Sequence, residues 1–267
     1  MQIEVSGAGQ AVAQGFRTSR LIRLKDGKSE SLRAGERAIQ AAKRMLLAQM
    51  GTMRKSPAIT CLILDIGGVL LTDGWSRDSR KQAVKRFELE SVELENRHHL
   101  TWDTHQQGRL TLAEYLSRVI FYQKRSFTRA QFQRFMFAQS RPYRDMIQLV
   151  AQLKLQHGLK VAVVSNEGRE LNAYRIRSFK LDVLVHFFIS SCFVHLLKPD
   201  ADIFRLALDI GQTTARQTIY IENTPMYVDI AEGLGIRSIL HADFKSTRAK
   251  LASFGLQISE PVIHEGS

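Results

Sequence analysis

Residues 60–75 read TCLILDIGGVLLTDGW, an apolar run that ends at one aspartate, Asp65, and then breaks at Gly67-Gly68. The apolar and β-branched residues over 59–65 predict a buried β-strand. Glycine adopts backbone conformations that other residues avoid, so the chain can turn sharply directly after this strand. The stretch therefore predicts a carboxylate at the end of a strand, beside a turn that a ligand can approach.

Strands and helices alternate through most of the remaining chain. Further strands are predicted at 159–165, 186–190, 218–222 and 237–241, and helices at 143–157, 200–210 and 226–233. Residues 79–140 read as helices alone, and Thr111 with Glu114 three residues later forms a capping box. Short hydrophobic strands separated by helices predict a parallel sheet covered on both faces. The expected fold is α/β, a Rossmann-like three-layer core with an inserted all-helical domain.

These patterns divide the chain into four parts. We expect a basic extension at 1–57, an α/β core at 58–76 and 141–258, a helical cap at 77–140 and a tail at 259–267. Residues 1–57 hold 11 Lys/Arg and 4 Asp/Glu, so they carry +7 of the total formal charge of +12. The basic residues are scattered and no nucleic-acid motif accompanies them, so nucleic-acid binding is not expected.

Composition excludes several classes of protein. The 267 residues are 44% hydrophobic and 24% charged, a balance typical of globular proteins. Cys61 and Cys192 lie in apolar runs and predict buried free thiols in a reducing cytoplasm. No apolar stretch approaches the roughly 18 residues that span a bilayer, and no secretory signal is evident. We expect a cytoplasmic protein with no membrane partner, and the sequence leaves a homodimer open.

Polar residues close the predicted strands. Asp65 follows the first strand, Ser165-Asn166 the second, Lys198-Pro199 the run HLL, and Glu222-Asn223 the strand TIYI. Ligands of open parallel sheets bind at the carboxyl ends of the strands. We therefore expect a carboxylate, a hydroxyl with an amide, an ammonium and a second carboxylate to meet at one edge.

In this order the residues resemble the haloacid dehalogenase (HAD) superfamily, whose members close four strands with Asp, Ser or Thr, Lys and one or two acids. LDIGGVL, VVSN, KPDADIF and IYIENTPMYVDIAEGLGI are similar to its four motifs, over residues 58–257. The helices after the first motif match the cap of the phosphatase-like subfamily, and GRLTLAEYL at 108–116 is similar to a stretch of those caps.

The resemblance implies a reaction and a cofactor. Asp65 would be the nucleophile, which forms an ester or acyl-phosphate that water later hydrolyses. Lys198 would lower the charge repulsion beside it. Mg²⁺ would add two positive charges, held by the Asp65 carboxylate, the Gly67 carbonyl and Glu222.

The resemblance also implies a cradle for the phosphoryl oxygens. Gly67 and Gly68 would offer backbone amides, Ser165 its hydroxyl, Asn166 a nearby amide, and Lys198 its ammonium.

Two positions depart from the pattern of the family. Phosphatases of this family usually carry a second aspartate two residues after the nucleophile, as general acid and base, and here that position is Gly67. Such a group typically contributes about 10²–10⁴-fold. Asp73 substitutes for it only if LLTDGW folds back over the site. Asn223 stands where many relatives have a second aspartate, which predicts a weaker Mg²⁺ site.

Three functions therefore stay open. The favoured one is a Mg²⁺-dependent phosphatase of small phosphorylated metabolites that acts through an aspartyl-phosphate. A metal-independent 2-haloacid dehalogenase is the second, because halide leaves without a proton, although those enzymes usually have an aromatic residue at the position of Gly67. The third is a catalytically impaired binding or regulatory protein on the same scaffold.

The cap contributes further candidates. Trp102, His98 and His105 are predicted to be partly exposed packing rather than substrate contacts. Arg77 and Arg80 lie at the start of the cap and are better candidates for contact with a phosphate. Even so, the favoured prediction is that both side chains are exposed to solvent.

Overall fold

The computed structural model describes residues 58–258. The predicted basic extension at 1–57 and the tail at 259–267 lie outside the described residues. Within the described part of the chain, no helix is long and apolar enough to cross a membrane.

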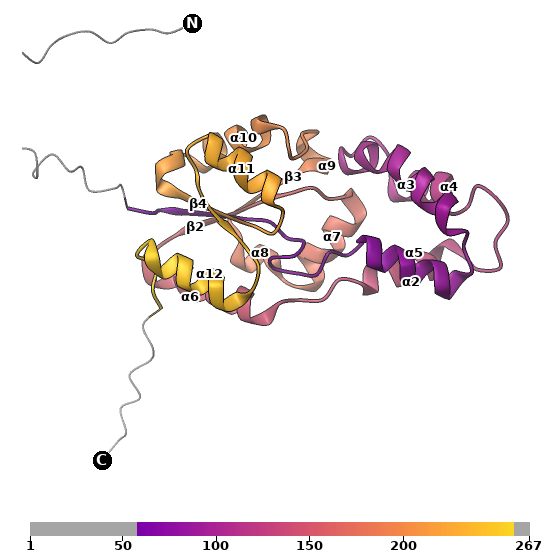
Figure 1. The fold of residues 1–267 in the computed structure, drawn as a ribbon, viewed down its shortest axis with the longest axis horizontal. Helices are drawn as coiled ribbons and strands as arrows, with labels where there is room; N and C mark the ends of the chain where they lie inside the picture. The colour runs from indigo at the N-terminus through magenta and orange to yellow at the C-terminus, as the bar shows by residue number, and fades with distance from the viewer. Residues whose placement is uncertain (1–57, 259–267) are drawn as a thin grey trace, which may run out of the picture. The chain divides into compact units, whose positions relative to one another are not determined.

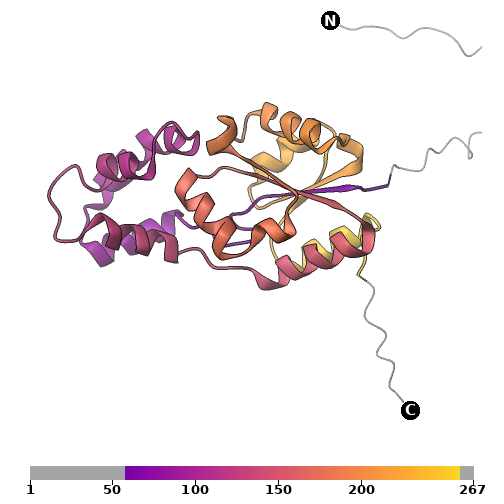
Figure 2. The same ribbon diagram turned by 180° about the vertical axis from the view of Figure 1, so that it is seen from behind.

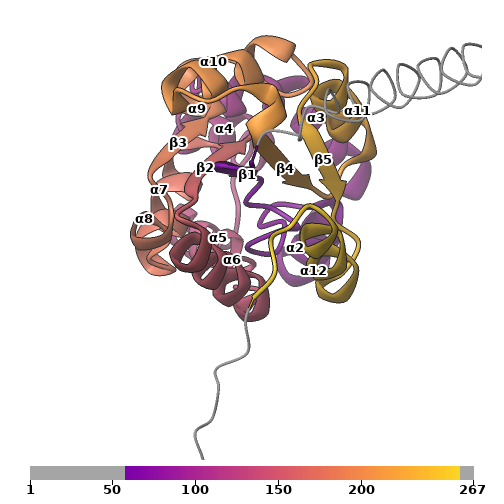
Figure 3. The same ribbon diagram turned by 90° about the vertical axis from the view of Figure 1, so that its left-hand side faces the viewer.

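Five parallel strands form the central sheet (Figure 1), and their order is β3-β2-β1-β4-β5 (Figure 3). The strands are β1 (Cys61–Leu64), β2 (Lys160–Ser165), β3 (Phe187–Ser190), β4 (Thr218–Glu222) and β5 (Arg237–Leu240). The first strand thus lies in the middle, with β2 and β4 as its two neighbours. This arrangement confirms the predicted α/β fold, and the five strands predicted at 59–65, 159–165, 186–190, 218–222 and 237–241 match observed ones to within two residues.

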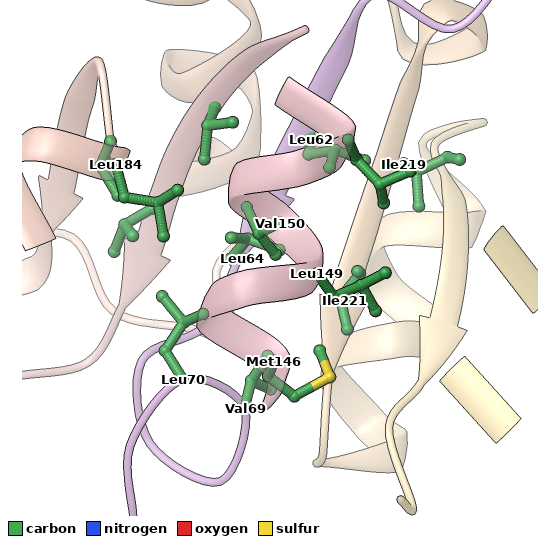
Figure 4. Packing of buried hydrophobic residues seen from close by; sticks show 14 of the residues in the cluster. Leu62, Leu64, Val69, Leu70, Met146, Leu149, Val150, Leu184, Ile219 and Ile221 are labelled. Atoms are coloured by element: carbon green, nitrogen blue, oxygen red, sulfur yellow. The ribbon is translucent and has the colours of Figure 1, made fainter. Parts of the chain in front are cut away.

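Alternate residues of the strands point to opposite faces of the sheet, and helices cover both (Figure 3). On one face, Leu62 and Leu64 pack with α6 (Arg144–His157), α8 (Leu181–Leu184) and α12 (Phe244–Ser253). Figure 4 shows Met146, Leu149 and Val150 of α6 over this face. This face of the sheet is apolar, and so is the opposite face, which is why the strands read as continuous hydrophobic runs.

The opposite face carries Cys61, Ile63 and Tyr220, which pack with α10 (Ala201–Gly211) and α11 (Pro225–Gly233). Cys61 and Cys192 are buried free thiols, as predicted. The remaining core elements are α7 (Arg169–Ser178), α9 (Ser191–Val194) and a 3₁₀ turn at Ala215–Gln217.

Four helices form the inserted cap: α2 (Arg77–Phe87), α3 (Ser91–Gln106), α4 (Leu112–Val119) and α5 (Arg129–Ala138). They lie beyond the carboxyl ends of the strands (Figure 2). Thr111 caps α4 in a complete capping box with Glu114, which is the pairing that the sequence predicts. Trp75, Tyr115 and Phe132 are buried in the hydrophobic core of the cap.

One local prediction is wrong. The run HLL before Lys198 is not a strand, because β3 ends at Ser190 and is followed by α9 and a loop. His195 ends α9 in a left-handed conformation with φ of 59°, which is incompatible with an extended strand. Lys198 is therefore brought to the sheet edge by a loop and not by a strand end.

Candidate active site

Three strands deliver polar side chains to the middle of the sheet edge. Asp65 directly follows β1, and its backbone amide donates to the Ile221 carbonyl at 3.0 Å, which extends the pairing with β4. Ser165 is the last residue of β2, and Glu222 is the last residue of β4. Because β2, β1 and β4 are adjacent, these three residues meet as predicted, and all three are buried.

The ammonium of Lys198 joins the two carboxylates. Its Nζ lies 3.0 Å from Asp65 Oδ1 and 2.6 Å from Glu222 Oε2. Lys198 is 3% exposed, so one buried cation serves two buried carboxylates. The cluster therefore has an excess of negative charge when all three groups are ionised.

The surroundings shift the acidities of this cluster. Burial, followed by the negative charge of Glu222, raises the pKa of Asp65 to about 7 against the opposing effect of Lys198. The two carboxylates outweigh the cost of burial at Lys198 and raise its pKa, so the ammonium stays charged. Asp65 thus changes its charge near neutral pH beside a permanent cation.

Glu222 is enclosed by protein on both carboxylate oxygens. Its Oε2 accepts from the Lys198 ammonium and from the Tyr220 hydroxyl, and its Oε1 accepts from the backbone amides of Asn223 and Thr224, each at 2.9 Å. The side chain is fully buried. Glu222 therefore holds the Lys198 ammonium in place from the side that faces away from the cavity.

Asn166 positions the same lysine through its backbone. The side-chain nitrogen Nδ2 of Asn166 donates to the backbone carbonyl of Lys198 at 2.8 Å. The backbone amide of Lys198 donates to Asn166 Oδ1 at 2.9 Å. This two-point contact engages the Asn166 side chain, which the sequence placed among the phosphate contacts. The Ser165 side chain lies beside Asp65 and opposes the rise in its pKa.

The glycine turn after Asp65 is closely packed. Gly68 has φ of +72°, and a Cβ at this position would lie 2.0 Å from the amide nitrogen of Asn223. Only glycine fits both the conformation and the space. The turn leaves Gly67 beside Asp65 and open to the cavity.

A cavity of about 350 Å³ opens at this edge, between the sheet and the cap. Asp65, Ser165 and Lys198 line it from the core, whereas Trp75, Arg77, Trp102 and Gln106 line it from the cap side. Gln106 also bridges the two parts, because its amide donates to the Asn166 carbonyl at 2.9 Å. A larger hollow of about 950 Å³, between α2 and α5, contains none of these residues.

A buried ion pair that the sequence does not predict lies beside the cavity. Arg175 of α7 and Glu167 form a salt bridge, and both side chains are less than 5% exposed. Arg175 also donates to the Ser140 hydroxyl at 3.0 Å and to the Thr72 carbonyl at 2.9 Å. It therefore fastens the segment after the glycine turn to the core.

Asp73 belongs to this fastened segment and lines the same cavity as Asp65. Its carboxylate lies beside Gly67, because a Cβ on Gly67 would be 2.6 Å from Asp73 Oδ1. The segment LLTDGW does fold back over the site. Burial of the carboxyl raises the pKa of Asp73, although its side chain still faces the open cavity.

Some of the candidate residues of the cap line the cavity, and others are buried away from it. Arg77 lines the cavity, whereas Arg80 is buried and forms a salt bridge with Glu95 at 2.8 Å. His98 and His105 were predicted to be partly exposed, but they are 8% and 1% exposed inside the cap. That prediction is wrong because both rings pack on Tyr115 in an aromatic cluster.

The expected Mg²⁺ ligands do not fit the ion as a set. Asp65 and the Gly67 backbone line the cavity, but Glu222 does not, and both of its oxygens already accept hydrogen bonds. Across residues 58–258, no group of three His, Cys, Asp or Glu side chains could hold a metal ion. We therefore derive no chemical step through a metal.

Comparison with known proteins adds independent information. The family model described as "Haloacid dehalogenase-like hydrolase" matches residues 63–241. No curated protein matches the sequence. Several solved structures share the fold at low sequence identity.

A HAD family enzyme from Bacteroides thetaiotaomicron, in complex with magnesium and inorganic phosphate, is 18% identical with a TM-score of 0.57, over 68% of this chain and 93% of its own. A predicted HAD-like hydrolase from Porphyromonas gingivalis is 17% identical with a TM-score of 0.59, over 73% and 98%. The L-2-haloacid dehalogenase from Xanthobacter autotrophicus, with chloropropionic acid covalently bound, is 16% identical with a TM-score of 0.51, over 78% and 92%.

Proposed function

The protein belongs to the haloacid dehalogenase-like hydrolases, and we propose that within this family it hydrolyses phosphoric monoesters of small metabolites through an aspartyl-phosphate. One observation carries the proposal: the Asp65 carboxylate faces a cavity with a buried ammonium 3.0 Å away. A nucleophilic oxygen and a fixed cation side by side suit an anionic substrate, because the cation offsets the repulsion between two anions.

The reaction starts with Asp65 ionised. Its oxygen attacks the phosphorus, and the bond from phosphorus to the leaving oxygen breaks. Lys198 stays protonated and stabilises the charge on the transferring group, since Glu222 and Asn166 fix both its side chain and its backbone. The backbone at Gly67, which lines the cavity, is the second group that we assign to the phosphoryl oxygens. The predicted role of Gly68 is wrong, because its amide donates to the Leu71 carbonyl at 2.7 Å and the residue does not line this cavity. Water then attacks the phosphorus and releases inorganic phosphate and the Asp65 carboxylate.

The size and lining of the cavity favour a small organic substrate over a polymer. Trp75, Trp102 and Gln106 close the cavity opposite the sheet edge, and its volume is about 350 Å³. A space of this size holds a metabolite-sized molecule. Arg77, which lines the same wall, would favour an anionic substrate.

The sequence predicts Mg²⁺ as a cofactor, but none of the reaction steps proposed above involves the ion. The Bacteroides thetaiotaomicron enzyme of similar fold was crystallised with magnesium and inorganic phosphate. In the present chain Glu222 is already enclosed by four hydrogen bonds. These bonds leave Glu222 occupied, so the proposed steps do not use Mg²⁺. The Mg²⁺ requirement expected from the sequence stays a prediction, and assays with Mg²⁺ and with EDTA test it.

The test is a panel of phosphomonoesters that includes p-nitrophenyl phosphate. We expect turnover by the wild type and a loss of at least about 10³-fold in Asp65→Asn, because the isosteric amide is not a nucleophile. Asp78→Asn, at an exposed position outside the cavity, is the matched control and should keep wild-type rates. Mass spectrometry after a rapid acid quench should find phosphate on the peptide that contains Asp65.

A second candidate, a 2-haloacid dehalogenase, is favoured by the absence of an acid at position 67 and by the enclosed Glu222, because displacement of halide needs neither a proton donor nor a metal. Its test is 2-chloropropionate in EDTA. Halide release that is lost in Asp65→Asn, without turnover of any phosphomonoester, would replace the phosphatase proposal. A protein that turns over neither substrate would favour the impaired binding protein.

A further inference from the structure

Asp73 lies where a side chain of residue 67 would otherwise be. A Cβ built on Gly67 would lie 2.6 Å from Asp73 Oδ1 and 3.9 Å from Asp65 Oδ2. The two carboxylates thus approach one point at the wall of the cavity, although Asp73 is eight residues further along the chain. The missing side chain at Gly67 leaves the room that Asp73 occupies.

The backbone on both sides of Asp73 is held by the core. Thr72 accepts from Arg175 at its carbonyl, and its amide and hydroxyl donate to the carbonyls of Arg141 and Gln139 at 2.9 and 2.7 Å. A Cβ on Gly74 would lie 2.3 Å from Arg175 Nη2, so the guanidinium packs directly against that residue too. Asp73 is therefore positioned by neighbours on each side.

The common structural roles of an aspartate in such a segment are taken by other groups. Ser76, and not Asp73, caps the following helix α2. Among residues 58–258, no donor forms a hydrogen bond or ion pair with the Asp73 carboxylate. Of the other acids that line the cavity, Glu167 is paired with Arg175 and Asp65 with Lys198. Asp73 is the carboxyl group that stays available to a ligand.

We propose that Asp73 is the proton donor to the leaving oxygen and the proton acceptor from the attacking water, in place of an acid at position 67. This inference rests on the proposed phosphatase activity. As the bond from phosphorus to the ester oxygen breaks, the Asp73 proton passes to that oxygen and an alcohol leaves. When water attacks the aspartyl-phosphate, one water proton returns to Asp73 while the bond from phosphorus to Asp65 breaks. The products are the alcohol and inorganic phosphate, and both aspartates regain their starting states.

The experiment compares two leaving groups in Asp73→Asn. p-Nitrophenolate leaves without protonation, whereas a simple alkoxide needs a proton. We expect kcat/KM for an alkyl phosphate to fall by about 10²–10⁴-fold, and that for p-nitrophenyl phosphate to fall by less than about tenfold. Asp78→Asn serves again as the control, and circular dichroism melts of each variant check that it is folded.

A relocation variant makes the test independent of simple damage at Asp73. In Gly67→Asp/Asp73→Ala, the carboxyl group moves to residue 67 and the space that it needs is vacated. We expect this double variant to turn over the alkyl phosphate at least about tenfold faster than Asp73→Ala alone. Rescue of this kind would not follow if Asp73 only supported the loop.

The possible failures are distinguishable. If the wild type turns over both esters and Asp73→Asn slows them equally, or slows neither, the proposed function stands and the role of Asp73 is overturned. If the double variant gives no rescue, the role is overturned as well. If the wild type turns over neither ester, the proposed function fails and this inference falls with it.

Discussion

At the sheet edge three buried side chains carry charge, whereas the buried polar side chains around Tyr115 in the cap are neutral. The edge holds Lys198 between Asp65 and Glu222. The cap holds Tyr115, whose hydroxyl accepts from Trp75 Nε1 at 2.8 Å and lies 2.7 Å from His98 Nδ1. The two regions pair these buried groups with different kinds of bond, ionic at the sheet edge and neutral around Tyr115.

The difference follows from what each region has to do. A buried charge costs several kcal/mol to desolvate and persists only with close partners. A site for an anion justifies this cost, because a fixed ammonium stabilises the bound charge. The cap has to keep an aromatic wall in place, and neutral hydrogen bonds between aromatic side chains suffice for that. The comparison teaches that the buried cluster of Lys198, Asp65 and Glu222 belongs to the chemistry of this molecule, whereas the buried neutral groups around Tyr115 belong to its scaffold.

The largest expected effect is on the charged side. Lys198→Met leaves Asp65 and Glu222 buried without their cation, and we expect the free energy of unfolding to fall by about 3–5 kcal/mol. Urea denaturation at pH 7 measures it. The control is Arg205→Met, which removes an exposed ion pair with Asp202 and should cost less than about 1 kcal/mol. Equal losses in the two variants would show that the buried cluster carries no special cost.

The sequence predicts the charged side better than the neutral side, for a physical reason. Asp65, Ser165 and Glu222 end apolar strands, and parallel strands bring their carboxyl ends together whatever else the chain does. Lys198 was found by its place in a motif, although the expected strand before it is a loop. Tyr220 carries a usable signal, because it lies two residues before Glu222 on the same side of β4.

Arg175 and the buried histidines gave no such signal. Arg175 lies on a helix of strongly polar sequence, RELNAYRIRS, and its burial depends on where α7 packs against the segment that contains Thr72. His98 and His105 lie on α3, which has no clear apolar stripe in sequence. Their burial comes from tertiary contacts with Tyr115, which no local pattern reveals.

On the neutral side we expect a smaller effect from Tyr115→Phe. Loss of one hydroxyl leaves Trp75 Nε1 and His98 Nδ1 without their buried partner, which should lower the free energy of unfolding by about 1–3 kcal/mol. Tyr143→Phe is the control, because Tyr143 is 38% exposed and should change stability by less than about 0.5 kcal/mol. A neutral result for Tyr115→Phe would mean that aromatic packing alone supports the cap.

The two regions should also respond to pH in opposite directions. Burial, helped by Arg80, lowers the pKa of His98 to about 3. Between pH 6.5 and 3 the unfolded chain binds a proton that the folded cap does not, so stability falls as the pH falls. Burial raises the pKa of Asp65 to about 7, so the folded state holds a proton that the unfolded chain has lost, and this contribution falls as the pH rises from 3.8 to 7.

His98→Asn separates the two contributions, since the amide offers the Tyr115 hydroxyl a polar partner without a titrating ring. We expect the decline in the free energy of unfolding below pH 6.5 to become shallower, by up to about 1.4 kcal/mol per pH unit. Urea denaturation at intervals from pH 7 to 4 measures the slope. His99→Asn, at an exposed neighbouring position, is the control. An unchanged slope in His98→Asn would show that protonation of the cap does not limit acid stability.

The smallest effect tests whether the regions differ in anything besides buried charge. Thr111→Ala removes the capping box of α4 in the cap, and Asp243→Ala removes the side-chain cap of α12 in the core, which accepts from the Ser246 amide at 2.9 Å. Both sites are exposed, so each loss should be about 1 kcal/mol by chemical denaturation. If helix ends cost the same in both regions, the contrast between cap and core resides in their interiors. A much larger loss at Thr111 would instead mean that α4 anchors the cap, whose backbone at Leu112 also donates to Glu170 of the core at 3.0 Å.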